Sequence, residues 1–488
     1  MTTTTTVLAF DFGASTGRAI KAVYDGDTIA CSEVHRFDNV PVFKEGHLRW
    51  NIEALLRETR IAIEKAGKID SLAFDTWGVD FGLLDADGRL LDDPVHYRDE
   101  RTKGWPDRVS KLIDRKKLYA GTGNQILEIN TLFQILALRE EQSELLKKTA
   151  HLLFLPDLLA VQLGAGLTWE KSIASTGQMW NPMTGTWNTS LLSTLNIDSR
   201  LLGVPTDSGR ITGSLPDGTK IVSVAGHDTQ CAVAAMPTVQ GECAAFLSCG
   251  TWSLIGCELE KPILTGESCE MGLSNEYGAN GKTNYLKNII GLWLIQESRR
   301  AYAKKGKDYT FSQLACLAED AKPFGSLIDP DAQEFVAPGN IPERIQEFCK
   351  RSGQPEPKTV GEIVRCIYES LALKYRYALE QLEVMTGQKF TVLHILGGGA
   401  NAELLCRMTA DACRLTVKAG PVEATALGNI IIQLKALSVI HDIDEGRQII
   451  AKTEKIKEYH PHKTQSLIWE NAYERFLTIV NMEKERQK

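Results

Sequence analysis

Two stretches of similar pattern lie about half a chain apart, and they constrain the fold more than any other feature. Residues 6–24 read "TVLAFDFGASTGRAIKAVY" and residues 243–259 read "CAAFLSCGTWSLIGCEL". Each combines an apolar strand, a turn of small polar residues and a second strand with alternating apolar residues. The chain has 488 residues, whereas one core seldom exceeds ~250 residues. The repeat therefore predicts two domains of duplicated architecture, residues 1–243 and residues 244–488.

The local patterns predict an α/β fold with mixed sheets. An Asp-Gly pair separates two alternating strands at residues 17–37, which is typical of a hairpin. Residues 51–67 repeat apolar side chains at helical spacing between an Asn and a Gly, and residues 69–90 indicate two strands around Trp77 and Gly78. Residues 358–387 predict one long amphipathic helix before a strand at residues 390–396. We also expect a helix to begin at Leu286, with Asn288, Trp293 and Gln296 on one face.

The two turns are candidate phosphate-binding loops. "DFGASTGR", residues 11–18, offers backbone amides and hydroxyls around glycines, and "SCGTWS", residues 248–253, places Thr251 at the equivalent point. A plain hairpin is the alternative for each turn taken alone, but a pair could grip one polyphosphate from both sides. The first turn also contains a Gly-x-Ser-x-Gly pattern centred on Ser15, which would suit a hydrolase only if a helix followed it.

Three further features are candidates for ligand contacts. Three glycines in "LGGGAN", residues 396–401, predict close approach either by a nucleotide or by a packed helix. Asp228 in "AGHDTQ" is either a general base or the cap of the following helix. His227 beside it lacks a second His or Cys at metal-binding spacing, which favours a substrate contact. Gly78 after Trp77 would suit the floor of a small polyol pocket.

Composition excludes several classes of protein. The chain has 55 basic and 62 acidic residues and no basic block, so a nucleic acid is not an expected partner. We find no signal peptide and no apolar run long enough to cross a membrane, so we expect no membrane partner and a soluble, cytoplasmic protein. Eleven cysteines without metal-binding spacing are consistent with a reducing compartment.

Taken in chain order, these motifs resemble the FGGY carbohydrate kinases, a branch of the sugar kinase, actin and Hsp70 superfamily. The resemblance runs from about residue 5 to about residue 460 and rests on "DFGASTGR", "FDTWGVDFGLLD", "YRDERT", "AGHDT", "SCGTWSLIG", "LKNIIGLWLIQ", "LGGGAN" and "AGPVEATALGNIIIQL". It implies two actin-like (ribonuclease H-like) domains with an ATP cleft between them. The N-terminal domain would bind mainly the sugar, the C-terminal domain would bind mainly the nucleotide, and ATP and Mg2+ are the implied cofactors.

The resemblance also implies roles for individual residues. Those expected to contact ATP are Ala14, Ser15, Thr16, Gly17, Arg18, Thr251, Gln296 and Gly398. Those expected to contact the sugar are Gly78, His227, Asp228, Thr229 and Asn288. Asp228 matches the catalytic base of the family, and Asp11 would influence the magnesium through water.

Within the family, the motifs are most similar to the branch that phosphorylates L-rhamnulose on its C1 hydroxyl. Ala14 replaces a Thr that is found in the more widespread pattern, which argues against the glycerol and xylulose branches. L-fuculose or a broader range of deoxyketoses remains an alternative, since "AGHDTQ" and "STGQMW" also look like the fuculose branch. An actin- or Hsp70-like ATPase without a sugar substrate is the alternative from another class. We expect a monomer or a homodimer.

Overall fold

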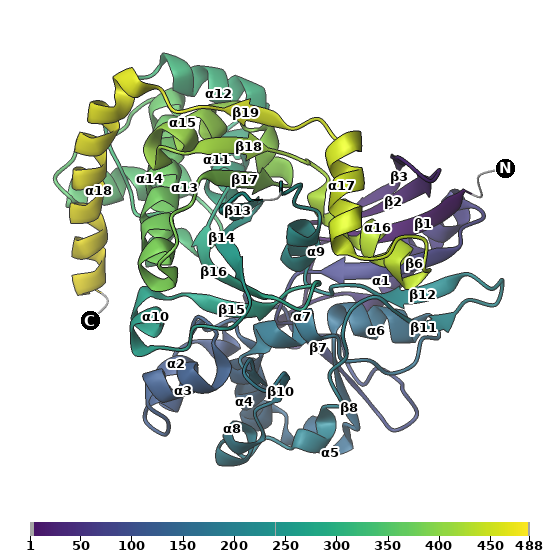
Figure 1. Ribbon diagram of the computed structural model, residues 1–488. Helices are drawn as coiled ribbons and strands as arrows, with labels where there is room; N and C mark the ends of the chain where they lie inside the picture. Colours follow the sequence, from purple (N-terminus) through teal and green to yellow (C-terminus); the bar gives the residue numbers. More distant parts are fainter. Residues whose placement is uncertain (1–3, 240, 487–488) are drawn as a thin grey trace. The chain divides into compact units, whose positions relative to one another are not determined.

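The computed structural model describes residues 4–239 and 241–486, which form two compact units. The first unit comprises residues up to Pro237 together with Glu258–Tyr285 and Ala424–Glu454. The second unit comprises Thr238–Cys257, Leu286–Glu423 and the residues from Lys455 onward. The predicted boundary near residue 243 lies close to the first crossing between the units, and two later segments return to the first unit. Figure 1 follows the chain by colour through these segments.

The first unit is built on a six-stranded mixed sheet. In spatial order its strands are β11 (Arg210–Ser214), β12 (Lys220–Ser223), β6 (Ser71–Thr76), β1 (Thr5–Phe12), β2 (Thr16–Tyr24) and β3 (Ile29–Asp38). Strands β1, β6 and β12 are parallel, and the remaining pairs are antiparallel. The predicted mixed sheet is therefore confirmed.

The two faces of this sheet differ in chemistry because side chains alternate along a strand. Phe10 and Phe74 stack with ring centroids 4.7 Å apart on the face that packs against α1 (Ile52–Ala66) and α6 (Leu155–Gln162). On the other face Ser71 and Asp75 contact α16 (Ala424–Ala436) through Gln433 and Asn429. One face is thus an apolar core and the other carries buried polar groups.

The predicted helix at residues 51–67 is confirmed and shows how the sequence sets its ends. Asn51 caps α1 by accepting a hydrogen bond from the Ala54 amide at 2.9 Å. Gly67 ends the helix at a φ of 67°, which suits a residue without a side chain.

The rest of the first unit consists of two-stranded sheets and helices, some inserted between the strands of the main sheet and some following it. The strands of the small sheets are β4 (Val42–Lys44), β5 (His47–Arg49), β7 (Phe81–Leu84), β8 (His151–Phe154), β9 (Trp180–Asn181) and β10 (Thr186–Trp187). The helices are α2 (Trp105–Ser110), α3 (Arg115–Thr122), α4 (Thr131–Glu141), α5 (Ser143–Lys148), α7 (Lys171–Ala174), α8 (Thr189–Thr194), α9 (Asp228–Ala234), α10 (Gly266–Met271) and α17 (Ile443–Thr453). Short 3-10 helices lie at η1 (Glu100–Thr102), η2 (Ser175–Gly177) and η3 (Ser199–Leu201).

The second unit repeats the strand arrangement of the first. Its sheet contains, in spatial order, β16 (Thr283–Ile290), β14 (Trp252–Leu259), β13 (Ala244–Cys249), β17 (Val392–Leu396), β18 (Thr416–Ala419) and β19 (Lys457–Tyr459). As with β1, the strand β13 is antiparallel to its hairpin partner and parallel to its other neighbour. Next to β16 lies β15 (Ser274–Tyr277), which belongs to the first unit together with the start of β16. The duplicated architecture predicted from the two turns is present in the strand order.

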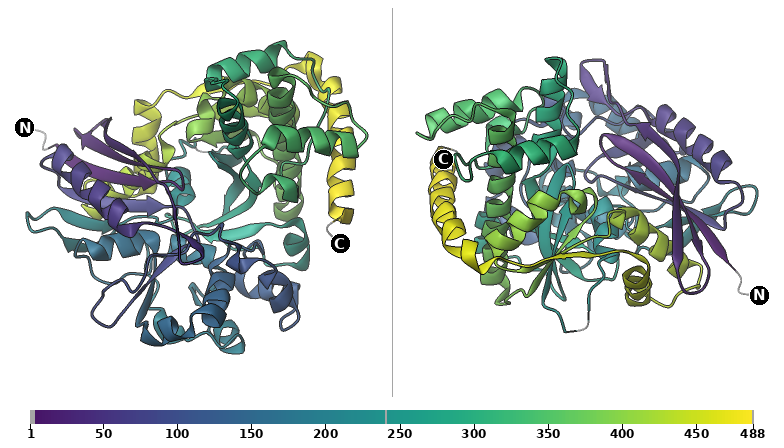
Figure 2. Two further views of the ribbon diagram at one scale, coloured as in Figure 1. Left: turned by 180° about the vertical axis from the view of Figure 1, so that it is seen from behind. Right: turned by 90° about the horizontal axis from the view of Figure 1, so that it is seen from above.

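Helices cover the second sheet. They are α11 (Trp293–Lys304), α12 (Phe311–Asp320), α13 (Ile341–Arg351), α14 (Val360–Thr386), α15 (Glu403–Cys413) and α18 (Ser466–Arg486), with η4 (Gln333–Phe335), η5 (Gly398–Asn401) and η6 (Lys463–Gln465) between them. The long helix α14 packs against α12 and α15, and α18 lies along α14 and α15 (Figure 2). The long helix and the strand predicted at residues 358–396 are both confirmed.

The helix expected to begin at Leu286 is wrong in its first part. Residues up to Ile290 continue strand β16, and helix α11 begins only at Trp293. A short apolar run that is buried on both faces has no periodicity that separates a strand from a helix. Gly291 makes the junction, where a Cβ atom would lie 2.4 Å from Ser253 Oγ. Asn288 and Gln296 therefore lie on different elements.

Candidate functional site

The first predicted phosphate loop is the turn between β1 and β2. The Gly13 amide donates to the Thr16 carbonyl at 2.9 Å, and Asn39 donates to the Gly13 carbonyl at 3.0 Å, so the turn is held from both sides. Ser15 is followed directly by strand β2, so the hydrolase interpretation, which needs a helix there, is wrong. Gly17 is required by packing, since a Cβ atom would lie 2.1 Å from the Phe37 ring.

Charged residues flank this turn on the sheet. Asp11 pairs across the strands with Arg18, whose Nη2 donates to the Asp11 carboxylate. Asp11 is also in register with Asp75 on β6. Burial raises the pKa of Asp75 well above its usual range, and the Asp11 charge adds to the shift. The Asp75 carboxyl accepts a hydrogen bond from Asn429 Nδ2 at 2.7 Å.

The segment after β6 carries Gly78, the predicted floor of the polyol pocket. Its backbone pairs with the loop that leads into Asp228, residues 224–228. The Thr76 amide donates to the Gly226 carbonyl at 2.8 Å, and Thr76 forms a parallel bridge with His227. The first unit thus brings Gly78 and His227 onto adjoining segments. A Cβ atom on Gly78 would lie 3.2 Å from Thr176 Cγ2, so this floor packs tightly against η2.

Val79, directly after Gly78, has an unusual backbone conformation. Its φ is 68°, which is a strained value for a β-branched residue. The Val79 amide donates to Thr176 Oγ1 at 3.1 Å, and Thr131 Oγ1 donates to the Val79 carbonyl at 2.6 Å. Side-chain hydrogen bonds to both its amide and its carbonyl therefore hold the strained residue and the glycine beside it.

Asp80 anchors the Trp77 side of the same loop. Its Oδ2 accepts from the indole nitrogens of Trp77 at 2.9 Å and Trp50 at 2.6 Å, and Gln134 donates to its Oδ1 at 2.9 Å. Burial raises the pKa of Asp80 to about 6, and the surrounding donors oppose that shift. The Asp80 carboxyl therefore holds the Trp77 ring in its orientation through the indole N–H.

Asp228 is the first residue of helix α9, and its side chain is 32% exposed. Its Oδ1 accepts the Thr229 amide at 2.6 Å and so satisfies one free helix amide, but the cap position of α9 is held by His227 and not, as the capping interpretation expected, by Asp228. The exposed fraction leaves the carboxylate accessible for a second function. Burial raises the pKa of Asp228, and the neighbouring His227 charge opposes the shift.

His227 lies between two carboxylates. Its Nδ1 is 3.0 Å from Glu276 Oε2 on β15, and its Nε2 is 3.4 Å from Asp228 Oδ1. Burial lowers the pKa of His227, but the attraction and hydrogen bond of Glu276 and the charge of Asp228 outweigh burial, so the net pKa is raised.

The second predicted phosphate loop is the turn between β13 and β14 in the second unit. The Gly250 amide donates to the Trp252 carbonyl at 2.8 Å, as Gly13 does at the first turn. Thr251 Oγ1 donates to Gln296 Oε1 at 3.3 Å, and the Thr251 carbonyl accepts the Trp293 amide at 3.2 Å. The structure therefore brings Thr251 and Gln296 together at the start of α11.

The three consecutive glycines differ in the space and backbone conformation at each position. Gly397 adopts a φ of 79°, and a Cβ atom on Gly399 would lie 2.2 Å from Cys249 Sγ. These two match the packing interpretation. Gly398 is exposed, with open space around the position of a Cβ atom, and so leaves room for a ligand. Asn288, the remaining sugar candidate, lies half-buried on β16 in the second unit.

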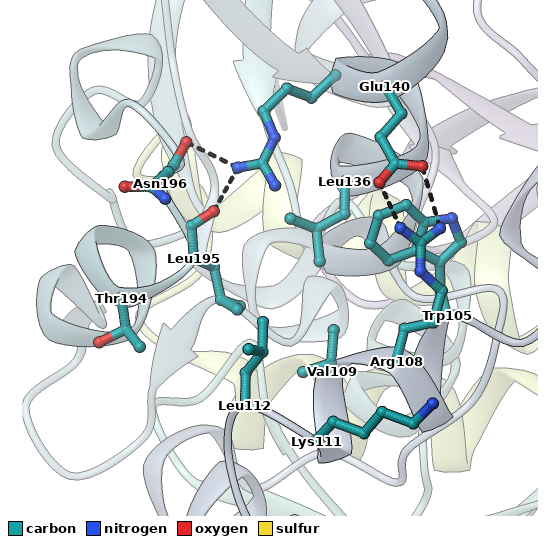
Figure 3. A pocket seen from close by; sticks show the side chains of 11 residues that line it. Trp105, Arg108, Val109, Lys111, Leu112, Leu136, Glu140, Thr194, Leu195 and Asn196 are labelled. Carbon is teal, nitrogen blue, oxygen red and sulfur yellow. Dashed lines mark hydrogen bonds and ion pairs between the residues drawn. The ribbon is translucent and has the colours of Figure 1, made fainter.

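A surface pocket of about 400 Å³ lies away from these residues, between α2, α4 and the segment after α8 (Figure 3). Three of its charged side chains are already paired: Arg108 lies 3.7 Å above the Trp105 ring and pairs with Glu140, and Arg139 donates to the Asn196 carbonyl at 3.0 Å. We assign this pocket no part in the chemistry.

Sequence reasoning missed two buried acids that hold the Asp228 loop. Glu170 Oε2 accepts the Gly226 amide at 2.9 Å, and Glu276 contacts His227. The available signal for Glu276 was its place in a stretch of otherwise uncharged residues, since such a charge is seldom buried without partners, whereas Glu170 is followed directly by Lys171 and carried no such signal. An isolated Glu of this kind indicates that a hydrogen-bonding partner exists, but the sequence does not identify which residue it is.

Comparison with known protein families decides the assignment. A model of the N-terminal domain of the FGGY family of carbohydrate kinases matches residues 6–235, and a model of the C-terminal domain matches residues 245–437. The chain belongs to the FGGY carbohydrate kinases. The sequence-based assignment to this family is confirmed, and the protein is a kinase.

Two relatives cover nearly the whole of this FGGY kinase. "Rhamnulokinase" of Bacteroides thetaiotaomicron is 37% identical over 485 residues, covering 97% of this chain and 99% of the relative. "Rhamnulokinase" of Enterobacter sp. is 38% identical over 473 residues, covering 94% and 95%. The crystal structure of gluconate kinase from Lactobacillus acidophilus matches with a TM-score of 0.78 at 15% identity, covering 98% of both chains. This last match supports the fold, and the expected two-domain, actin-like α/β architecture is confirmed.

Two absences hold for the described part of this FGGY kinase. No helix within residues 4–239 and 241–486 is long and apolar enough to span a membrane. Among the same residues, no three or more His, Cys, Asp or Glu side chains group as a metal site. The ligand roles assigned to individual residues stay predictions.

Proposed function

We propose that this kinase transfers the terminal phosphoryl group of ATP to the C1 hydroxyl of L-rhamnulose, giving L-rhamnulose 1-phosphate and ADP. The two near-full-length relatives named Rhamnulokinase support the choice of substrate. The observation that carries the chemistry is Asp228, an accessible carboxylate at the start of α9 beside the buried His227.

Asp228 is the proposed general base. A sugar hydroxyl is a weak nucleophile at neutral pH, so a positioned carboxylate that accepts its proton accelerates attack. Gly78, His227 and Thr229 lie in the same unit as Asp228 and are the proposed sugar contacts. Asn288, in the second unit, is the remaining proposed contact.

The residues proposed for ATP and magnesium fit those groups. Magnesium is usually held by one or two carboxylates together with substrate phosphates and water, and Asp11, at the end of β1 beside the first turn, is the carboxylate proposed to act on it through water. When bound, ATP supplies the phosphoryl group and magnesium offsets part of its charge. Arg18, the hydroxyls of Ser15 and Thr16 and the backbone of the first turn are proposed phosphate contacts, as is Thr251 in the second turn. Gly398 leaves its backbone accessible for the nucleotide.

A coupled kinase assay tests the proposal. ADP release is measured with L-rhamnulose, L-fuculose, L-xylulose and L-ribulose, and we expect the highest kcat/KM with L-rhamnulose. Discrimination between epimers rests on hydrogen bonds to individual hydroxyls. A higher kcat/KM for L-fuculose would replace the proposed substrate, and ADP release that no ketose stimulates would contradict a sugar kinase.

We further propose that the protein acts in the cytoplasm, where ATP is available, as a monomer or a homodimer. Its proposed partners are the sugar and ATP, with no nucleic acid or membrane required for the reaction.

A further inference from the structure

Glu276 is a buried acid that lies outside every predicted site position. It is on β15, is 4% exposed, and its Oε2 accepts from Gln230 Nε2 at 2.8 Å as well as facing His227 Nδ1 at 3.0 Å. Gln230 in turn accepts a hydrogen bond from Asn284. A buried carboxylate is costly unless such partners compensate it, so the arrangement is a built feature of the first unit.

The positions of the two carboxylates favour the protonated form of the histidine. Ionised carboxylates only accept hydrogen bonds, whereas a neutral imidazole can donate from one nitrogen alone. His227 has Glu276 at Nδ1 and Asp228 at Nε2, at 3.0 and 3.4 Å. Only the imidazolium form donates toward both carboxylates.

We propose that Glu276 is a positioning residue, which holds His227 as an imidazolium whose Nε2–H faces Asp228 and so keeps the Asp228 carboxylate ionised and oriented. The inference rests on the proposed function, because Asp228 is its base. Glu276 acts through His227 and does not itself touch the sugar.

The electrostatics of the cluster agree with this chain of contacts. Glu276 raises the pKa of His227 against the effect of burial, and the His227 charge lowers the pKa of Asp228 against the effect of burial. The other charged groups that face the pair are Asp11 on β1, Asp75 on β6 and Glu170 before α7. All three are acids, and the cation beside them, Arg18 on β2, is paired with Asp11. His227 is thus the cation in contact with Asp228.

The decisive variant is Glu276→Gln, which keeps the side-chain size and removes the charge. Without that charge the pKa of His227 falls, the ring loses its proton near neutral pH, and the pKa of Asp228 rises. The acidic limb of the kcat–pH profile should therefore move to higher pH by about one unit. At a fixed pH below the midpoint of that limb, kcat should be about tenfold lower than in the unmodified protein. A change in KM or stability alone, with the limb unmoved, would overturn the proposal.

Gln230→Met is the matched control, because the Gln230 side chain donates to the same Glu276 carboxylate but carries no charge that acts on His227 or Asp228. We expect it to lower the melting temperature and to leave the acidic limb in place, since the Glu276 charge remains. A limb shift as large as that of Glu276→Gln would show that general loosening, and not the charge, moves the profile, and would count against the proposal.

A measurement on the unmodified protein keeps the inference testable if the variant fails to fold. In 15N NMR of histidine-labelled protein, with the His227 signals identified by their loss in His227→Asn, we expect both ring nitrogens of His227 to be protonated at pH 7. A neutral tautomer at that pH would overturn the inference. This result is independent of the sugar, so it separates failure of the inference from failure of the proposed substrate.

Discussion

At the scale of single residues, the hydrogen bond of Asp228 to the backbone of its own helix leaves the side chain free for its proposed role as a base. Its carboxylate accepts the Thr229 amide at the start of α9, and its side chain is still 32% exposed. The hydrogen bond orients the carboxylate, and the exposure leaves it accessible to a hydroxyl. The hydrogen bond to the helix amide is therefore compatible with the proposed role of Asp228 as a base.

The variant Asp228→Asn should abolish most turnover. The amide cannot accept a proton, so we expect kcat to fall by about 10²- to 10⁴-fold while the fold and sugar binding persist. Steady-state kinetics and calorimetric sugar titration measure the two effects separately. Asp87→Asn, at an exposed acid whose side chain is 69% accessible, is the control. A near-normal kcat in Asp228→Asn would remove Asp228 from the role of base.

At the scale of elements, the loop after β6 is held in a strained shape by its neighbours. Val79 has a φ of 68°, and η2 supplies Thr176, whose hydroxyl accepts the Val79 amide. Thr176 Oγ1 also donates to the Ile173 carbonyl at 2.7 Å. One hydroxyl thus ties the loop that carries Gly78 to the end of α7.

We expect Thr176→Val to destabilise this loop. The change leaves the buried Val79 amide without its acceptor, which costs about 1–3 kcal/mol of folding free energy, and it should raise KM for the sugar more than it lowers kcat. Chemical denaturation and steady-state kinetics measure the two effects. Thr176→Ser keeps the hydroxyl and should retain most of both properties, and equal losses in the two variants would contradict this role of the hydrogen bond.

At the scale of the whole molecule, the first unit depends on segments far along the chain. Helix α16 covers the polar face of the first sheet, where Gln433 accepts from Ser71 at 2.7 Å and Asn429 donates to Asp75. Ile430 and Leu434 of the same helix are fully buried. A chain that ends near residue 243 lacks this cover.

A fragment of residues 1–243 should therefore not fold cooperatively by itself. The fragment would expose the sheet face that α16 covers in the intact protein, with its polar groups and apolar side chains. We therefore expect no sharp thermal transition and a tendency to aggregate. Circular dichroism during heating measures the transition. A fusion that adds residues 258–285 and 424–454 through flexible linkers is the comparison, and a fragment as cooperative as the intact chain would contradict the dependence.

Local features of the fold could be predicted because their causes lie within a few residues. Asn51 and Gly67 mark the ends of α1, and the alternation after each turn marks β2 and β14. The motif residues of the candidate site could be identified for the same reason, since each motif is a short contiguous stretch. Where local periodicity was ambiguous, at Leu286–Ile290, the prediction of a helix was wrong.

By itself, the sequence determined the duplicated strand–turn–strand units, the α/β class, the family and the candidate residues, because these depend on short-range pattern and on contiguous motifs. Only the tertiary structure decided which distant side chains meet. Glu276 reaches His227 across 49 positions of sequence, and Asn429 reaches Asp75 across 354. Such contacts are set by how separate segments pack over the sheet, where burial forces each polar group to find a partner, and no local periodicity encodes that partner.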